Sequence, residues 1–419
     1  MQPENARIKP AGTLIVGAGQ AGLQFATTLR ELGDTGSITL IGGEDRLPYQ
    51  RPPLSKAFLQ GTLNEDGLSL RGESFYADNQ ISLITGEWVT SANITDAATG
   101  AGTATTNTGR QLAFDHLALT TGGTPRLIPV PGNDLAGIHY LRNVADATRL
   151  RTELETAERV VVVGGGFIGM EAAAGAAAAG KQVIVVEFLD RLLSRAVAPE
   201  TSRFYLTAHR KRGVEIRLKV GVTGFTDATG AGRVTGVELS DGRSVPADLV
   251  VVGVGLTPHT ELAELLGLTC KGGIVIDQAG RTSIATVFAA GDCTVLNHPE
   301  LGMVRLESVQ NAIFQAKIGA ATLLGVPPPE TEVPWFWSDQ GDLKLQIAGL
   351  SMGYDDVVVR GDPATESFSV LYYRGDAFIA IDSINAGRDY MAGRRILQAG
   401  KNVPKQAAGD PNRPLKDFL

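Results

Sequence analysis

Short apolar runs alternate with longer helical patterns in the first part of the chain. Runs at 13–16 and 37–41 have the length of buried strands, and the stretch between them has helical character. The same unit returns at 160–163 and 182–187, around an Ala-rich stretch that ends near residue 180. Strands that alternate with helices indicate a parallel sheet with crossover helices, so we predict an α/β fold with two Rossmann-like domains.

The remainder of the chain is different in character. Residues 81–108 and 225–250 have the pattern of short strands joined by Gly/Asn/Thr/Asp turns. After Pro327, Pro328 and Pro329 a third region begins, and we expect its tail after Lys401 to be loosely ordered. Strands in this region are predicted around 343–347, 357–360 and 367–373, with a helix near 388–399. At 419 residues the chain is long enough for two or three domains.

Both strand-to-helix junctions carry a GxGxxG motif. In the first, Gly17 permits a tight turn, Gly19 lets backbone approach a pyrophosphate, and Gly22 allows the helix to pack closely on the strand. The helix N-terminus offers free N–H groups to phosphates. For a single motif of this kind, a glycine-rich turn that binds no ligand is the alternative interpretation. The second motif consists of Gly164, Gly166 and Gly169.

Acidic residues after the second strand of each unit are candidates for ribose contacts. Glu187 ends the strand at 182–187, where a carboxylate would bind ribose hydroxyls and repel a 2′-phosphate, which favours NADH over NADPH. Arg191 and Arg195 follow and weaken that preference. In the first unit the corresponding carboxylate comes slightly late, at Glu44. The alternative for Glu187 is a solvated strand end, and the alternative for Glu44 is an exposed acid in a loop.

Other segments fit flavin binding. In PYQRPPLSK two prolines hold the loop extended, with Arg51 and Lys56 fixed nearby as cations that would stabilise a pyrophosphate or a reduced, anionic flavin. LALTTGGTPR leads through a glycine turn to Arg126. TSIATVFAAGD delivers Asp292 onto a turn that we expect to start a helix, where the carboxylate can accept hydrogen bonds from ribityl hydroxyls or cap the following segment.

Composition narrows the possible classes of function. The net charge of −7 argues against a chain-wide nucleic-acid surface. The chain has two cysteines, Cys270 and Cys293, without the spacing of a disulfide framework or a metal site. The N-terminus has no signal-peptide pattern, and no apolar stretch is long enough to span a bilayer. We therefore expect a soluble, cytoplasmic protein that has no metal site and binds neither nucleic acid nor membrane.

Together these motifs resemble one family. GAGQAG, PYQRPPLSK, TTGGTPR, GGGFIGME, VVGVGLTP, VFAAGDC, RLESVQNA and VPWFWSDQGDLKLQIAGL, in this order, are similar to the ferredoxin reductases of bacterial oxygenase systems. The resemblance runs from about residue 13 to residue 390. It implies a glutathione-reductase-like fold, with an FAD domain at 1–122 and 248–328, an NAD domain at 123–247 and a C-terminal α+β domain at 329–419.

The resemblance also implies site residues. Many relatives have an acid where this chain has Gly43, so the FAD ribose contact is assigned to Glu44. Catalytic positions would be Lys56, Glu171, Glu307 and Trp337. FAD would contact Gly17, Gly19, Gln20, Ala21, Gly22, Glu44, Arg51, Lys56, Val89, Arg126, Asp292, Val309 and Trp337. The nicotinamide dinucleotide would contact Gly164, Gly166, Ile168, Gly169, Glu171, Glu187, Arg195 and Gly255.

The implied activity is transfer of hydride from NADH to FAD, then of single electrons to a 2Fe–2S ferredoxin that serves an oxygenase. The chain lacks the CxxC or CxxxxC pair of disulfide-reducing relatives and the redox cysteine of peroxide-reducing ones. Lys317 and Lys344 are candidates for docking an acidic ferredoxin, and we expect a monomer or weak dimer. The alternatives are a rubredoxin reductase, an NADH diaphorase, or a signalling flavoprotein like apoptosis-inducing factor.

Overall fold

The computed structural model describes residues 11–96 and 98–419, and contacts within the chain divide it into two units. The first comprises the described residues up to Gln50, Ser69–Thr124 and Thr257–Thr331, and the second comprises Arg51–Leu68, Pro125–Leu256 and Glu332–Leu419. Two short strands, β8 (Gly123–Pro125) and β17 (Leu256–Pro258), lie where the chain passes from one unit to the other.

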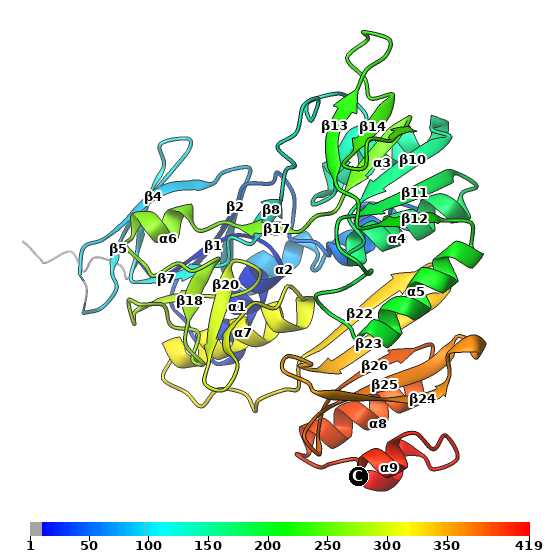
Figure 1. The fold of residues 1–419 in the computed structure, drawn as a ribbon. Coiled ribbons are helices and arrows are strands. Elements are labelled where there is room, and N and C mark those ends of the chain that lie inside the picture. The colour runs from blue at the N-terminus through cyan, green and yellow to red at the C-terminus, as the bar shows by residue number, and fades with distance from the viewer. Residues whose placement is uncertain (1–10, 97) are drawn as a thin grey trace, which may run out of the picture. The chain divides into compact units, whose positions relative to one another are not determined.

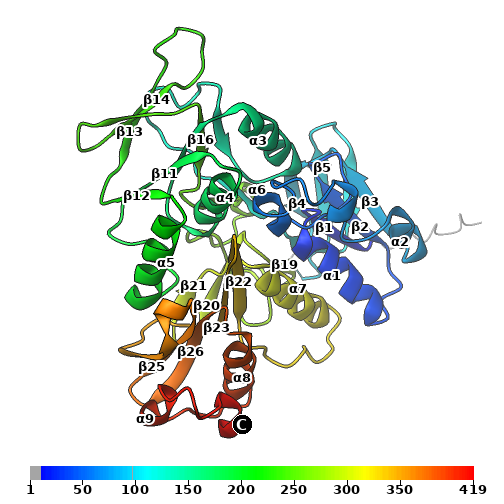
Figure 2. The same cartoon turned by 90° about the vertical axis from the view of Figure 1, so that its right-hand side faces the viewer.

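The first unit is built on a parallel sheet in the order β19-β7-β1-β2-β3. Helices α1 (Gln20–Glu31) and α7 (Val309–Leu323) run side by side along it (Figures 1 and 2). Phe25 of α1 and Phe288 of β19 are buried in the core between helix and sheet. The five strands are β1 (Thr13–Val16), β2 (Ile38–Gly42), β3 (Ile81–Thr85), β7 (His116–Leu119) and β19 (Val287–Ala289).

Smaller elements complete this unit. An antiparallel sheet follows the order β4-β5-β6, and a second small sheet the order β18-β20-β21. Their bounds, with those of two short helices, are β4 (Val89–Ile94), β5 (Gly102–Thr106), β6 (Gln111–Phe114), β18 (Ile274–Ile276), β20 (Thr294–His298), β21 (Gly302–Val304), α2 (Glu73–Asp78) and α6 (Glu261–Leu265).

The second unit begins with another parallel sheet, in the order β12-β11-β10-β16-β9. The valines of β10 are almost completely buried, as expected for a parallel strand covered on both faces. The bounds are β9 (Ile138–Tyr140), β10 (Arg159–Val163), β11 (Gln182–Glu187), β12 (Glu215–Leu218), β16 (Leu249–Val252), α3 (Val144–Thr156), α4 (Phe167–Ala178) and α5 (Pro199–Lys211). An antiparallel sheet, β13 (Val222–Thr226), β14 (Gly236–Leu239) and β15 (Ser244–Pro246), is attached.

The C-terminal part of this unit is an antiparallel sheet in the order β22-β23-β26-β25-β24, between α5 and α8 (Figure 1). Alternate residues of β25 face opposite sides: Tyr372 joins the core that includes Tyr205 of α5, and Tyr373 the core that includes Tyr390 of α8. The bounds are β22 (Trp335–Gln340), β23 (Leu343–Gly349), β24 (Asp356–Asp362), β25 (Ser367–Arg374), β26 (Ala377–Ile384), α8 (Gly387–Gln398) and α9 (Lys405–Ala408).

The predicted α/β architecture with a C-terminal α+β domain is confirmed. Three details differ from the prediction: the strand β26, the place of residues 249–252, and the order of the tail after Lys401. The sequence pattern did not indicate β26 as a separate strand. Residues 249–252, assigned to the FAD segment, pair with β10 in the second sheet. The domain boundaries otherwise stay predictions.

The tail after Lys401 is ordered, contrary to expectation. The buried guanidinium of Arg360, on β24, donates to the backbone oxygens of Ala408, Asp410 and Arg413 and to the carboxylate of Asp389. These contacts attach the last residues to the sheet. No helix among residues 11–96 and 98–419 is both long and apolar enough to cross a membrane.

Candidate functional site

The first glycine loop has the geometry that a dinucleotide needs. Gly17 has φ +114°, and a Cβ there would lie 2.1 Å from the backbone oxygen of Thr120. A Cβ on Gly22 would lie 2.0 Å from the backbone oxygen of Gly17, so only glycine allows this approach of α1 to the loop. A Cβ on Gly19 would meet nothing within 4 Å. The loop therefore leaves open space beside the N-terminus of α1, where a pyrophosphate would fit.

The second loop repeats this arrangement in the other unit. Gly164 has φ +103° and approaches the backbone oxygen of Gly253, which would lie 2.4 Å from a Cβ. A Cβ on Gly169 would lie 2.1 Å from the backbone oxygen of Gly164, whereas the nearest atom to one on Gly166 is 3.9 Å away. Both loops thus fit the cofactors that the sequence predicts, each at the start of its own helix.

Glu187 lies beside the second loop. Its Oε2 accepts a hydrogen bond from the backbone N–H of Gly165 at 2.6 Å, and its Oε1 one from that of Leu189 at 2.7 Å. The carboxylate is thereby fixed at the end of β11 with lone pairs left for ribose hydroxyls.

Two arginines follow Glu187 and differ in their contacts. Arg191 donates to the backbone oxygens of Ser194 and Val197 and to the hydroxyl of Ser202, so it shapes its own loop. Arg195 is exposed, and its guanidinium lies 3.6 Å from where a Cβ on Gly255 would be. Of the two, Arg195 is better placed to meet a nucleotide.

A buried polar cluster surrounds Glu171 of α4, whose side chain is 4% exposed. The ammonium of Lys56 lies 2.8 Å from its Oε2, and the hydroxyl of Ser55 donates to the same oxygen at 2.5 Å. The hydroxyl of Ser338, on β22, donates to Oε1 at 2.6 Å. The carboxylate thus accepts on both oxygens, as an acceptor-only group requires when it is buried. These contacts connect the turn at Pro52–Ser55 with α4 and with the C-terminal sheet.

The cluster contains a lysine and a glutamate that the sequence predicted and two serines that it did not. The loop PYQRPPLSK forms a 3₁₀ turn at Pro52–Ser55, which directs Ser55 and Lys56 towards Glu171. On β22, Ser338 and Gln340 are both buried. The polar residues Ser338 and Gln340 at alternate positions, directly after three aromatic residues, were the signal that could have revealed this inward-facing pair.

The other predicted contacts are distributed over both units. In the second unit, Arg126 donates its backbone N–H to the backbone oxygen of Gly255, Arg51 donates to that of Arg142, and Ile168 is exposed on α4. Trp337 is half-buried on β22, with its ring centroid 5.9 Å from that of Trp335.

In the first unit, Glu44 accepts a hydrogen bond from the hydroxyl of Tyr49 at 2.6 Å, and Glu307 pairs with Arg305. Val309 is the first residue of α7. Gln20 and Ala21 begin α1, Val89 begins β4, and Asp292 follows β19.

The turn that carries Asp292 does not start a helix, because β20 follows it directly at Thr294. Cys293 lies in this turn, fully buried, with its thiol directed at the backbone oxygens of Leu119 and Ala290. Burial raises the pKa of the Cys293 thiol, which disfavours the reactive thiolate. The described residues contain no group of His, Cys, Asp and Glu side chains that could hold a metal ion.

Comparison with known proteins agrees with this geometry. The Pyridine nucleotide-disulphide oxidoreductase family matches residues 12–316, and the Reductase C-terminal family matches residues 335–419. A ferredoxin–NAD(P)(+) reductase from a Sphingomonas species is 43% identical over 411 residues, which cover 97% of each chain.

Two solved structures are also similar over nearly their whole length. Putidaredoxin reductase in its covalent complex with putidaredoxin has a TM-score of 0.93 at 40% identity, covering 97% of each chain. The ferredoxin reductase for the CYP199A2 system of Rhodopseudomonas palustris has a TM-score of 0.92 at 42% identity, covering 97% of this chain and 99% of that one. The chain therefore belongs to the pyridine nucleotide-disulphide oxidoreductase family and, within it, to the ferredoxin reductases.

Proposed function

We propose that the protein takes a hydride from NADH onto FAD and passes the electrons singly to a 2Fe–2S ferredoxin that serves an oxygenase. Family membership makes it an FAD-dependent oxidoreductase that uses a nicotinamide dinucleotide. The observation that carries the proposal is the pair of glycine loops with open middle glycines, each at a helix N-terminus. Bound FAD would supply the conversion between two-electron and one-electron chemistry.

The residues of the chain would bind the two cofactors, align them and set the charge around them. We assign the first loop, with Gln20, Ala21, Glu44, Val89, Asp292 and Val309, to FAD, together with Arg51, Lys56, Arg126 and Trp337. We assign the second loop, with Ile168, Glu171, Glu187, Arg195 and Gly255, to NADH, and Glu307 and Trp337 to positions near the nicotinamide.

In this assignment Lys56 is the cation beside the flavin. Its ammonium is fixed by Glu171, and its side chain is 18% exposed, so one side remains free to face a cofactor. A fixed ammonium stabilises negative charge that develops during hydride transfer without reorganising at that moment. The two cysteines are free, and neither is needed in this scheme.

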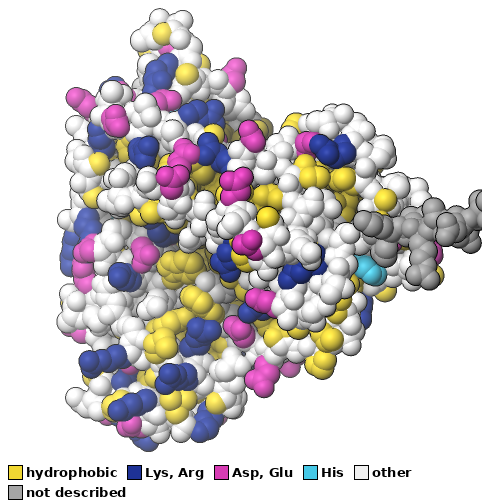
Figure 3. Space-filling model, turned by 180° about the vertical axis from the view of Figure 1, so that it is seen from behind, with side chains coloured by type: hydrophobic (Ala, Val, Ile, Leu, Met, Phe, Trp, Pro, Cys, Tyr) yellow, Lys and Arg dark blue, Asp and Glu magenta, His cyan; other side chains and the backbone are white. Residues whose placement is uncertain are grey.

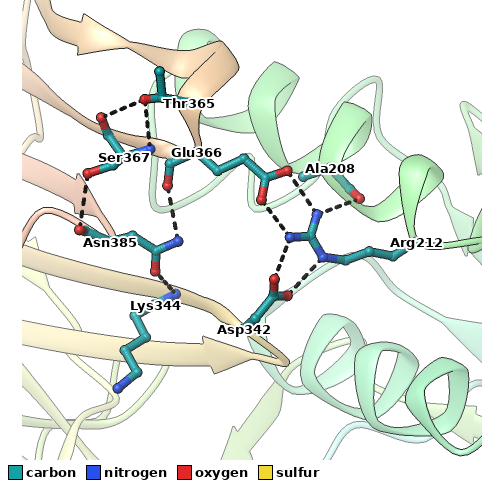
Figure 4. A network of polar contacts seen from close by, with 8 residues as sticks. All are labelled: Ala208, Arg212, Asp342, Lys344, Thr365, Glu366, Ser367 and Asn385. Carbon is teal, nitrogen blue, oxygen red and sulfur yellow. Dashed lines mark hydrogen bonds and ion pairs between the residues drawn. The ribbon is translucent and has the colours of Figure 1, made fainter.

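The ferredoxin surface is assigned by charge. Figure 3 shows lysine and arginine side chains among hydrophobic ones over the C-terminal domain. Lys344 is exposed on β23, and its side chain points away from the polar contacts around it (Figure 4). Lys317 lies on α7 of the other unit. Basic groups at the rim of such a surface would act mainly on the association rate with an acidic ferredoxin.

The test is NADH-dependent reduction of cytochrome c by the purified holoenzyme with and without added 2Fe–2S ferredoxin. We expect rapid reduction only when ferredoxin is present, and faster turnover with NADH than with NADPH. Equal rates without ferredoxin would indicate a diaphorase, and a preference for rubredoxin over ferredoxin would indicate a rubredoxin reductase. Either result would replace the proposal.

A further inference from the structure

Buried hydrogen bonds continue from Glu171 away from Lys56. The Nε2 group of Gln340 donates to the hydroxyl oxygen of Ser338 at 3.3 Å, and Nε2 of His209, on α5, lies 2.7 Å from Oε1 of Gln340. Ser338, Gln340 and His209 are all completely buried. An unbroken chain of side chains therefore joins α5 to the Lys56–Glu171 pair through two residues of β22.

The hydrogen bonds in this series of side chains all run in one direction. Because Nε2 of Gln340 donates to Ser338, its Oε1 is the acceptor, and His209 must carry its proton on Nε2. The hydroxyl of Ser338 in turn donates to Glu171. Every donor points towards the carboxylate, so each bond polarises the next in the sense that favours charge on Glu171.

The neutral state of His209 fits this direction. Burial lowers the pKa of His209, and the charge of Arg212 lowers it further, whereas the hydrogen bond that His209 donates to Gln340 and the charge of Asp342 raise it. Its Nδ1 is buried with no hydrogen-bond partner among the described residues, so protonation there would place an unpaired N–H in the interior.

Ion pairs of Arg212 hold together the two elements that carry these hydrogen-bonded side chains. Arg212, one turn after His209, donates to both carboxylate oxygens of Asp342 at 2.8 and 2.7 Å and to those of Glu366 at 3.1 and 2.6 Å (Figure 4). Asp342 comes two residues after Gln340, so these ion pairs fix the end of β22 against α5. A cavity of about 570 Å³ adjoins this contact, lined among others by Gln60, His209 and Gln340.

We propose that His209 and Gln340 are positioning residues for hydride transfer: they hold Ser338 against Glu171, and Glu171 in turn holds the ammonium of Lys56 at the flavin. This rests on the proposed function, in which Lys56 is the cation beside FAD. Neither residue touches a cofactor in this scheme, and both act through the carboxylate.

The experiment measures the rate of reduction of bound FAD by NADH, without oxygen and without ferredoxin, and the midpoint potential of the FAD. We expect His209→Phe and Gln340→Met each to slow reduction about five-fold, the change that loss of a hydrogen bond of about 1 kcal/mol produces, with the NADH dissociation constant unchanged. The midpoint potential should become more negative. In His209→Gln the amide nitrogen can replace Nε2, and we expect the rate to recover.

Thr201→Val is the matched control. Thr201 lies on the same helix and bonds to Asp382 of the same sheet, but it is outside the chain that leads to Glu171. We expect it to lower thermal stability without changing the reduction rate or the potential. A rate loss in this control equal to that in His209→Phe would reduce the chain to a structural role and overturn the proposal, as would unchanged rates and potentials in both test variants.

If the variants fail to fold, a spectroscopic measurement on the wild-type protein still tests the proposal. In the wild-type holoenzyme, ¹⁵N chemical shifts should show the His209 imidazole protonated on Nε2 and bare on Nδ1 from pH 6 to 8. The opposite tautomer, or a charged ring at pH 7, would overturn the proposed direction. None of these measurements uses ferredoxin. Failure to reduce ferredoxin would therefore contradict the proposed function, whereas the FAD reduction rates and the ¹⁵N shifts would still decide this inference.

Discussion

Asp382→Asn should remove a pH dependence of stability that originates inside the C-terminal domain. Asp382, on β26, is completely buried, and its Oδ2 accepts hydrogen bonds from the hydroxyls of Tyr372 and Thr201. Its Oδ1 has no hydrogen-bond partner among the described residues. Burial raises the pKa of Asp382 from 3.8 to about 7, against the two hydrogen bonds, which lower it.

The direction of this pH dependence follows because burial favours the protonated carboxyl of Asp382 in the folded protein. Unfolded chains release this proton near pH 4, so the contribution is complete below that pH and is lost as pH rises through about 7. A shift of about three pKa units, at about 1.4 kcal/mol per unit, corresponds to about 4 kcal/mol of unfolding free energy from the buried carboxyl. Burial raises the pKa of Tyr205 and of Tyr372, so both neighbours stay neutral throughout.

The assay is urea unfolding of the holoenzyme at intervals from pH 4.5 to 8. We expect wild type to lose stability with rising pH relative to Asp382→Asn, which keeps the acceptor at Oδ2 and cannot ionise. Asp356→Asn is the control, because the hydrogen bond from Lys405 lowers the pKa of that exposed carboxyl and confines its effect to acidic pH. Parallel stability curves for wild type and Asp382→Asn would refute the reasoning.

Three further changes test the assigned residues. Glu187→Ala combined with an arginine nearby should shift the NADH:NADPH ratio of kcat/KM towards NADPH, and full retention of NADH selectivity would place specificity elsewhere. Replacement of Cys270 and Cys293 by Ser should leave NADH-dependent ferredoxin reduction within about two-fold of wild type, and a collapse with the fold intact would indicate a thiol mechanism. Lys317→Glu and Lys344→Glu should raise the KM for ferredoxin, most at low salt, with ferricyanide reduction unchanged. Insensitivity to both reversals and to salt would locate the docking face elsewhere.

Local sequence patterns were sufficient to predict the two glycine turns but not the cluster around Glu171. The turn conformations of Gly17 and Gly164 were predictable because they depend only on a strand and a helix within a few residues of them. Ser338 joins Glu171 across 167 positions, and only the packing of β22 on α4 brings them together. β26 was missed for a related reason: it contains the buried, polar Asp382, whose partners are Tyr372 on the neighbouring strand β25 and Thr201 on α5. Its sequence therefore lacks the apolar pattern expected of an interior strand.

The attachment of the tail to Arg360 also affects the order in which this chain can fold during synthesis. Its guanidinium is buried within a strand, yet three of the oxygens that it binds belong to residues some fifty positions later. Until those residues have emerged from the ribosome, closing the sheet would bury a cation whose donors lack those acceptors. Final closure of the C-terminal domain therefore requires that residues 408–413 have been synthesised, whereas the first parallel strands can pair much earlier.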